Sequence, residues 1–164
     1  MTISSPEDFA TLLTERFALQ DIIHFKVFMG LIADGNHVHP SIAAMLQKLA
    51  PEKIFLVSDA LSPYGLNHTK FEWDKRKLII QNGVCKLEEG KLAGTTVPLL
   101  ECCKRIALWT NNPSWAIWSA TVSPRFAFQK KTTIKELLLG KPLKRLLRWN
   151  FNFQSKLLNW NEAE

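Results

Sequence analysis

The sequence predicts an α/β fold, and three observations lead to this prediction. Two short apolar runs, residues 26–33 and residues 54–58, are rich enough in aliphatic side chains for strands buried on both faces. Residues 40–50 between them place apolar side chains at helical spacing. A β-prone stretch then follows at residues 71–92. The strand–helix–strand order predicts two parallel strands with a right-handed crossover.

The first expected element is a helix over residues 6–19. Ser5 can cap its N-terminus and Pro6 suits its first position. Glu7 and Asp8 carry negative charge at the positive end of the helix dipole. The strand at residues 26–33 comes next, and the helix at residues 40–50 ends before Pro51.

The β-prone stretch contains two runs, residues 73–80 and 84–87. Asn82-Gly83 lies between them and is a strong hairpin signal. Glu89-Gly90 offers a second turn. We therefore expect a small β excursion here and no further helical layer.

A helix over residues 97–109 is expected after Gly94-Thr95-Thr96. Thr95 or Thr96 would cap it, and Pro98 fits its first turn. The free N–H groups of such a helix start could hold an anionic or polar ligand, although many helices begin this way with nothing bound. The remaining expected elements are a helix over 114–122 stopped by Ser123-Pro124, a short helix over 133–139 capped by Gly140, and a pair of strands within 143–160 around Asn152.

Composition predicts an ordinary soluble globular protein. Hydrophobic residues make up 46% of the 164 residues and charged residues 22%. We see no secretory signal and no apolar run of the ~20 residues that a membrane span needs. The three cysteines, Cys85, Cys102 and Cys103, are an odd number with two adjacent, which is a poor disulfide framework. We therefore expect reduced thiols, a cytoplasmic location and no membrane partner.

The net charge of +6 lies in the last third of the chain, where residues 111–164 carry nine basic and three acidic side chains. Such a segment could contact nucleic acid or an acidic partner. The basic residues are spread out among leucines, however, and a solvated basic face explains them better. We do not expect a nucleic-acid partner.

Two aspartates mark a candidate active-site face. Asp34 follows the first predicted strand and Asp59 follows the second. Function collects at the carboxyl ends of parallel strands in α/β folds. Asp34-Gly35 permits a sharp turn that brings His37 over these strand ends, where a carboxylate and an imidazole can serve as general acid/base and substrate ligand.

Asp34, His37 and His39 also have the composition of a metal cluster. The other interpretation is that His39 caps or flanks the helix beginning at Pro40. We favour the second, because the strand has already ended at Asp34.

Three segments together resemble the N-acetylglucosamine-6-phosphate deacetylases. Residues 31–40 resemble the family's Ile-Ala-Asp-Gly-x-His-Val motif. Residues 55–60 resemble its Leu-Val-Thr-Asp-Ala motif, with Ser58 replacing the threonine. Residues 82–96 resemble its Asn-Gly … Gly-x-Leu-x-Gly-Ser/Thr-Ser/Thr segment. The spacing agrees as well, and the match runs from about residue 27 to at least residue 108.

The resemblance implies a metal-dependent amidohydrolase on a (β/α)8 barrel that removes acetate from N-acetylglucosamine-6-phosphate. The aspartate matching Asp59 is the catalytic acid/base, and the histidine matching His37 binds the sugar phosphate. The segment matching Leu92, Ala93 and Gly94 lines the substrate pocket. The cofactor is a divalent metal, zinc or similar.

The resemblance also implies that this chain corresponds to the C-terminal half of such a barrel, with a small β excursion. The family's metal ligands, a glutamate and two histidines, precede the matched region and have no counterpart in residues 1–26. We expect three parts: residues 1–25, a helical segment outside the match; residues 26–140, a partial barrel; and residues 141–164, a basic β segment. The expected protein partner is another copy of the chain or a missing N-terminal half. The alternative is a catalytically inactive remnant, or a half-barrel that acts only with a partner.

Overall fold

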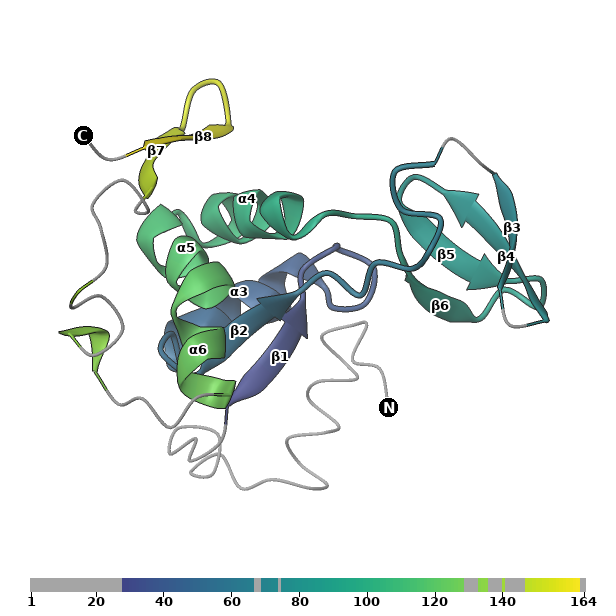
Figure 1. Cartoon of the computed structure of the whole chain (residues 1–164), viewed down its shortest axis with the longest axis horizontal. Coiled ribbons are helices and arrows are strands. Elements are labelled where there is room, and N and C mark those ends of the chain that lie inside the picture. The colour runs from purple at the N-terminus through teal and green to yellow at the C-terminus, as the bar shows by residue number, and fades with distance from the viewer. Residues whose placement is uncertain are drawn as a thin grey trace.

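A computed structural model describes residues 28–66, 69–73, 75–128, 133–135, 140 and 147–162. Within these ranges the chain forms a layer of strands and helices, a separate small β-sheet and a C-terminal hairpin (Figure 1). The small sheet projects from the carboxyl ends of the two strands in the α/β layer. The residues of the candidate site lie where these two parts meet.

The α/β layer begins with the predicted parallel strand pair. β1 (Met29–Ile32) pairs with β2 (Ile54–Val57), with Leu31 opposite Leu56. Helix α3 (Pro40–Leu49) connects them, as its apolar spacing predicts. The prediction of a strand–helix–strand unit is confirmed for the residues described.

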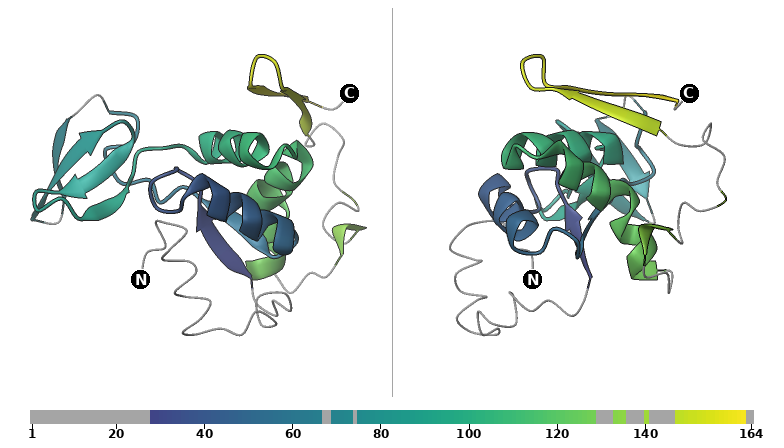
Figure 2. Two further views of the ribbon diagram at one scale, coloured as in Figure 1. Left: turned by 180° about the vertical axis from the view of Figure 1, so that it is seen from behind. Right: turned by 90° about the vertical axis from the view of Figure 1, so that its left-hand side faces the viewer.

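Helices cover one face of this strand pair. α4 (Leu99–Thr110) and α5 (Pro113–Thr121) pack with α3 around Leu31, Ile54 and Leu56 (Figure 2). Gln47 of α3 is almost fully buried, and its amide exchanges hydrogen bonds with the Ser119 hydroxyl of α5. That buried pair ties two helices together through polar groups that satisfy each other.

Ser123-Pro124 does not simply end a helix, as the sequence analysis expected. α5 stops at Thr121, and a further helix, α6 (Ser123–Phe128), starts directly afterwards. Proline near a helix start lacks only an N–H group that would have no partner there, so the same dipeptide suits the new helix. Phe128 of α6 makes an edge contact with Phe55 of β2, with ring centroids 5.5 Å apart.

The β excursion is an antiparallel sheet of four strands in chain order. Asn82-Gly83 forms the predicted turn, with both residues at positive φ. The run at residues 73–80 is divided by a turn, with Lys75 at positive φ, which the sequence analysis did not foresee. The strands are β3 (Lys70–Trp73), β4 (Arg76–Gln81), β5 (Val84–Leu87) and β6 (Leu92–Thr95).

The helix predicted over residues 97–109 is confirmed as α4, but the prediction that Thr95 or Thr96 caps it is wrong. Residues 92–95 form strand β6, and α4 begins at Leu99 with Pro98 as its N-cap residue. Thr95 is drawn into the sheet because its backbone pairs with both β5 and the segment after β2. Because residues 94–96 do not begin a helix, the prediction that they form a ligand-binding helix terminus is also wrong.

The C-terminal strand pair is confirmed as β7 (Leu147–Asn152) and β8 (Leu157–Glu162). Asn152 shapes their turn, since its side-chain oxygen accepts hydrogen bonds from the N–H groups of Gln154 and Ser155. Leu158, Trp149 and Phe151 pack against the helical core. The hairpin is therefore docked on the α/β layer (Figure 2).

Two other predicted helices lie wholly or mostly outside the described residues, at 6–19 and 133–139. The described helices include none with the length and apolar character to cross a membrane.

Candidate active site

The first part of the site is the loop that follows β1. Asp34 accepts hydrogen bonds on Oδ1 from the backbone N–H groups of Asn36 (3.0 Å) and His37 (2.9 Å). Gly35 adopts a φ of +80°, and the side-chain NH₂ group of Asn36 donates a hydrogen bond to the Asp34 backbone carbonyl. This is a side-chain-stabilised turn of the kind that Asp-Gly favours, and it directs His37 back over the strand ends.

The second part is a row of three side chains from two strand ends. His37 Nδ1 lies 3.0 Å from Asp34 Oδ2, and His37 Nε2 lies 3.6 Å from Asp59 Oδ2. The Asp34 side chain is fully buried, the His37 side chain is 12% exposed and the Asp59 side chain is 42% exposed. The structure thus brings together the three residues that the sequence predicted, with the imidazole between the carboxylates.

Asp34 is held as a carboxylate. Burial raises its pKa, but the hydrogen bonds from the His37 side chain and from the backbone N–H groups of His37 and Asn36 outweigh burial and bring the pKa to about 2. Arg105 of α4 also donates a hydrogen bond to the Asp34 carbonyl oxygen. The inner end of the row therefore has a fixed position and a fixed charge.

Asp59 is held by Thr95 of the small sheet. Asp59 has φ = +52°, a conformation that costs non-glycine residues energy and is found preferentially at functional sites. The Thr95 N–H donates to the Asp59 carbonyl (3.0 Å), and the Thr95 hydroxyl donates to the Ser58 carbonyl (2.8 Å). Thr95 itself is fully buried. The small sheet therefore maintains the unusual backbone of the candidate acid/base.

Gly94 permits this close approach. A Cβ atom at Gly94 would lie 2.8 Å from Leu61 Cγ and 3.1 Å from the Asp59 carbonyl oxygen, with φ at +151°. No larger residue fits without displacing one of these groups. Gly94 thus supports the loop carrying Asp59, although it does not itself line the cavity described next.

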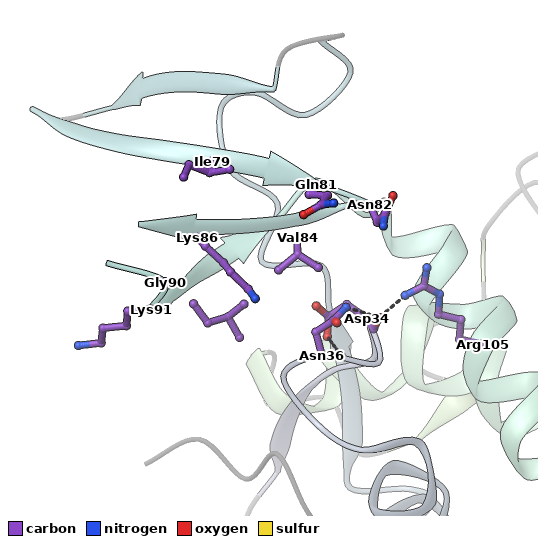
Figure 3. Close-up of a pocket in the computed structure, with 11 residues that line it drawn as sticks. Asp34, Asn36, Ile79, Gln81, Asn82, Val84, Lys86, Gly90, Lys91 and Arg105 are labelled. Carbon is purple, nitrogen blue, oxygen red and sulfur yellow. Dashed lines mark hydrogen bonds between the residues drawn. The ribbon is translucent and has the colours of Figure 1, made fainter. Parts of the chain in front are cut away.

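A cavity of about 780 Å³ separates the small sheet from the loop after β1. Figure 3 shows Lys86 and Lys91 on the sheet side, with Asp34, Asn36 and Arg105 opposite. Of the residues predicted to bind substrate, Leu92 lines this cavity. His37 is adjacent to it through its contact with Asp34, whereas Ala93 is only half-buried nearby on β6.

Sequence reasoning missed the support that Arg105 and Thr95 give to this site. Arg105 belongs to no motif that the sequence shows, and its i, i+4 ion pair with Glu101 is common on exposed helix surfaces. Thr95 was considered only as a helix cap. His39, by contrast, caps α3 as favoured, because its Nδ1 accepts from the Ser41 N–H at 3.3 Å.

The described residues do not fit a metal centre, since no group of three or more His, Cys, Asp or Glu side chains among them, the row of Asp34, His37 and Asp59 included, has an arrangement that could hold a metal ion. The cysteines do not add a nucleophile. Burial raises the pKa of Cys102 to about 11 and that of Cys103 to about 12. Burial, together with the charge of Asp59, also raises the pKa of Cys85. All three are buried and free, as expected for inert thiols.

Comparison with curated proteins finds relatives of one chemical kind. The N-acetylglucosamine-6-phosphate deacetylase of Vibrio furnissii is 28% identical over 121 residues, which cover 73% of this chain and 30% of the relative. The N-acetylgalactosamine-6-phosphate deacetylase of Shewanella sp. (strain ANA-3) is 31% identical over 118 residues, which cover 71% of this chain and 30% of the relative. The chain therefore spans about a third of the length of these relatives. No family model matches the chain.

Solved structures share the fold. The N-acetylglucosamine-6-phosphate deacetylase from Thermotoga maritima superimposes with a TM-score of 0.60 at 20% identity, covering 76% of this chain and 40% of that one. The N-acetylglucosamine-6-phosphate deacetylase from Pasteurella multocida superimposes with a TM-score of 0.59 at 20% identity, covering 65% of this chain and 28% of that one. In sequence and in fold, this chain resembles part of the N-acetylglucosamine-6-phosphate deacetylases.

Proposed function

We propose that this chain carries one part of a deacetylase site for an N-acetylated amino-sugar phosphate, with Asp59 as the general acid/base. In this proposal β1 and β2 are successive strands of a partial (β/α)8 barrel. The observation that carries the proposal is the row Asp34–His37–Asp59 at the ends of parallel strands, beside a cavity.

Asp59 has the position and exposure that acid/base work needs. Its carboxylate is 42% exposed while its backbone is clamped by Thr95, so the reactive oxygens can reach a substrate from a fixed base. In the proposed reaction Asp59 accepts the proton of the attacking water and passes it to the departing amine. The amide C–N bond breaks, and acetate and the free amino sugar are released.

The cavity suits a phosphorylated sugar. Lys86, Lys91 and Arg105 line it, and Asp34, whose carboxylate is already fully engaged, is the one acidic residue among its lining residues. An excess of positive charge attracts a phosphate group. We propose that His37 and Leu92 contact the sugar, with Ala93 and Gly94 supporting the same wall.

A divalent metal belongs to the proposal only by resemblance. Because the described residues do not gather a ligand set, we propose that any ligands come from residues outside the described ranges or from a partner chain.

The proposal is tested by measuring acetate release from N-acetylglucosamine-6-phosphate, with and without added zinc. We expect release by the wild-type chain and loss of at least about 100-fold in Asp59→Asn, the range for a removed acid/base. The matched control is Asn159→Asp, which changes an exposed side-chain amide in the C-terminal hairpin. Asn159 is not among the residues that line the cavity. Release that persists in Asp59→Asn contradicts the proposed mechanism, and absence of release from the wild type favours the alternative, an inactive remnant or a half-barrel that acts only with a partner.

N-acetylgalactosamine-6-phosphate is a second candidate substrate. It is supported by the Shewanella relative, which is 31% identical and named for that sugar. The two sugars differ in the configuration of one hydroxyl group, so the same assay run with both substrates decides between them by their kcat/KM values.

A further inference from the structure

We infer that Asp34 is a positioning residue that fixes the proton of His37 on Nδ1 and thereby presents Nε2 toward Asp59. The effect of this arrangement on catalysis rests on the proposed function. The proton position does not, because it follows from the hydrogen-bond geometry around the Asp34 carboxylate.

The two oxygens of Asp34 have separate partners. Oδ1 accepts from two backbone N–H groups, those of Asn36 and His37. Oδ2 faces His37 Nδ1 at 3.0 Å. Because the carboxylate is fully buried and ionised, it can only accept at that contact, so Nδ1 has to carry the proton.

The opposite ring nitrogen has a different environment. His37 Nε2 is 3.6 Å from Asp59 Oδ2, beyond an ordinary hydrogen bond, and the Asp59 side chain is partly exposed. Nε2 is therefore the nitrogen that remains available to a ligand. When the ring is neutral, Nε2 is an acceptor, and when the ring is protonated, it becomes a second donor.

The substitution Asp34→Asn separates orientation from proton placement. The Asn oxygen can keep both backbone hydrogen bonds of the turn, which leaves its NH₂ group facing His37 Nδ1. Two donors cannot share that contact, so the neutral ring should move its proton to Nε2. An aspartate-to-asparagine change beside a histidine acts in this way in serine proteases, where the wrong tautomer is the recorded result.

The molecule contains its own reference histidine. His39 Nδ1 accepts a hydrogen bond from the Ser41 N–H, so the His39 proton belongs on Nε2, the reverse of His37. The two rings are therefore expected to show opposite tautomers in one spectrum.

The test is ¹⁵N NMR of the imidazole nitrogens in the full chain at about pH 8.5, above the ordinary histidine pKa of ~6.5. The His37 and His39 signals are assigned by the single variants His37→Gln and His39→Gln. We expect a protonated Nδ1 for His37 in the wild type and an unprotonated Nδ1 in Asp34→Asn. The control Asn36→Ala, which removes a hydrogen bond to the Asp34 carbonyl but keeps the carboxylate, should leave Nδ1 protonated.

An unprotonated His37 Nδ1 in the wild type overturns the inference, and so does an Asp34→Asn chain in which Nδ1 keeps its proton. If Asp34→Asn does not fold, the wild-type spectrum still decides. In the acetate assay Asp34→Asn should raise KM about tenfold, the effect of losing one hydrogen bond between His37 Nε2 and the substrate. A wild-type chain that releases no acetate but shows the expected tautomer refutes the proposed function and leaves this inference standing.

Discussion

Replacing Thr95 by valine isolates the hydroxyl group that connects the small sheet to the loop carrying Asp59. Valine has nearly the same shape, so packing changes little while the hydroxyl is lost. The Thr95 hydroxyl donates to the Ser58 carbonyl at 2.8 Å and accepts from the Val97 N–H at 3.1 Å. Thr95 is fully buried, so water cannot replace these bonds without a change in structure.

Two backbone groups would lose a partner in Thr95→Val. An unsatisfied buried group costs about 1–3 kcal/mol, and the Val97 N–H is buried while the Ser58 carbonyl is only partly buried, so the free energy of unfolding should fall by about 2–3 kcal/mol. That is a large fraction of the 5–15 kcal/mol typical of a folded protein. The hydrogen bonds of Thr95 to Ser58 and Asp59 also hold the Asp59 backbone at φ = +52°, so acetate release should fall together with stability.

The assay is urea unfolding followed by tryptophan fluorescence, with the midpoint compared at constant m-value. Thr95→Ser keeps the hydroxyl and should recover most of the loss. Thr121→Val is the matched control, because its hydroxyl donates to Ile117 within one helix, where the carbonyl already has a backbone partner. A Thr95→Val chain that loses less than about 1 kcal/mol, or no more than Thr121→Val, would refute the reasoning.

Three further predictions concern the same region. Gly94→Ala should destabilise the chain and lower acetate release, because its Cβ would meet Leu61 Cγ at 2.8 Å; urea unfolding and the acetate assay check this, and an unchanged chain contradicts it. Stability should fall as pH drops from about 5 toward 2, by about 2 kcal/mol from Asp34 alone. The folded pKa of Asp34, about 2, lies below the ordinary 3.8, so the ionised carboxylate stabilises the fold above the unfolded pKa and this stabilisation is lost on acidification. The free energy of unfolding of Asp34→Asn should therefore depend less on pH than that of the wild type. An equal dependence would contradict the lowered pKa of Asp34. The double change of Lys86 and Lys91 to glutamine should raise KM for the sugar phosphate several-fold with little change in kcat, and an unchanged KM would remove these lysines from the site.

Local pattern predicted the parts of the fold that depend on local physics. Strand β2 and helix α3 were predicted to within a residue at their ends, because apolar spacing and prolines define them. The loop after β1 was also predictable, since Asp34-Gly35 encodes a turn that returns His37 to the strand ends.

The errors came from long-range contacts. Gly94-Thr95-Thr96 has the composition of a helix start, but Thr95 forms hydrogen bonds to residues 58, 59 and 61, far away in sequence. Such pairing overrides local propensity. Arg105 contacts the Asp34 carbonyl across 71 positions, and nothing near it in sequence indicates that partner.

The central claim is that an N-acetylated amino-sugar phosphate binds between the loop after β1 and the small sheet. The most direct measurement is a titration of the ¹⁵N-labelled chain with N-acetylglucosamine-6-phosphate, followed by amide NMR shifts, with glucose 6-phosphate as the control sugar. We predict saturable shifts concentrated at Asn36, His37, Leu92 and Arg105, with weaker binding of the control. Shifts confined to other parts of the chain, or none at millimolar ligand, would contradict the account.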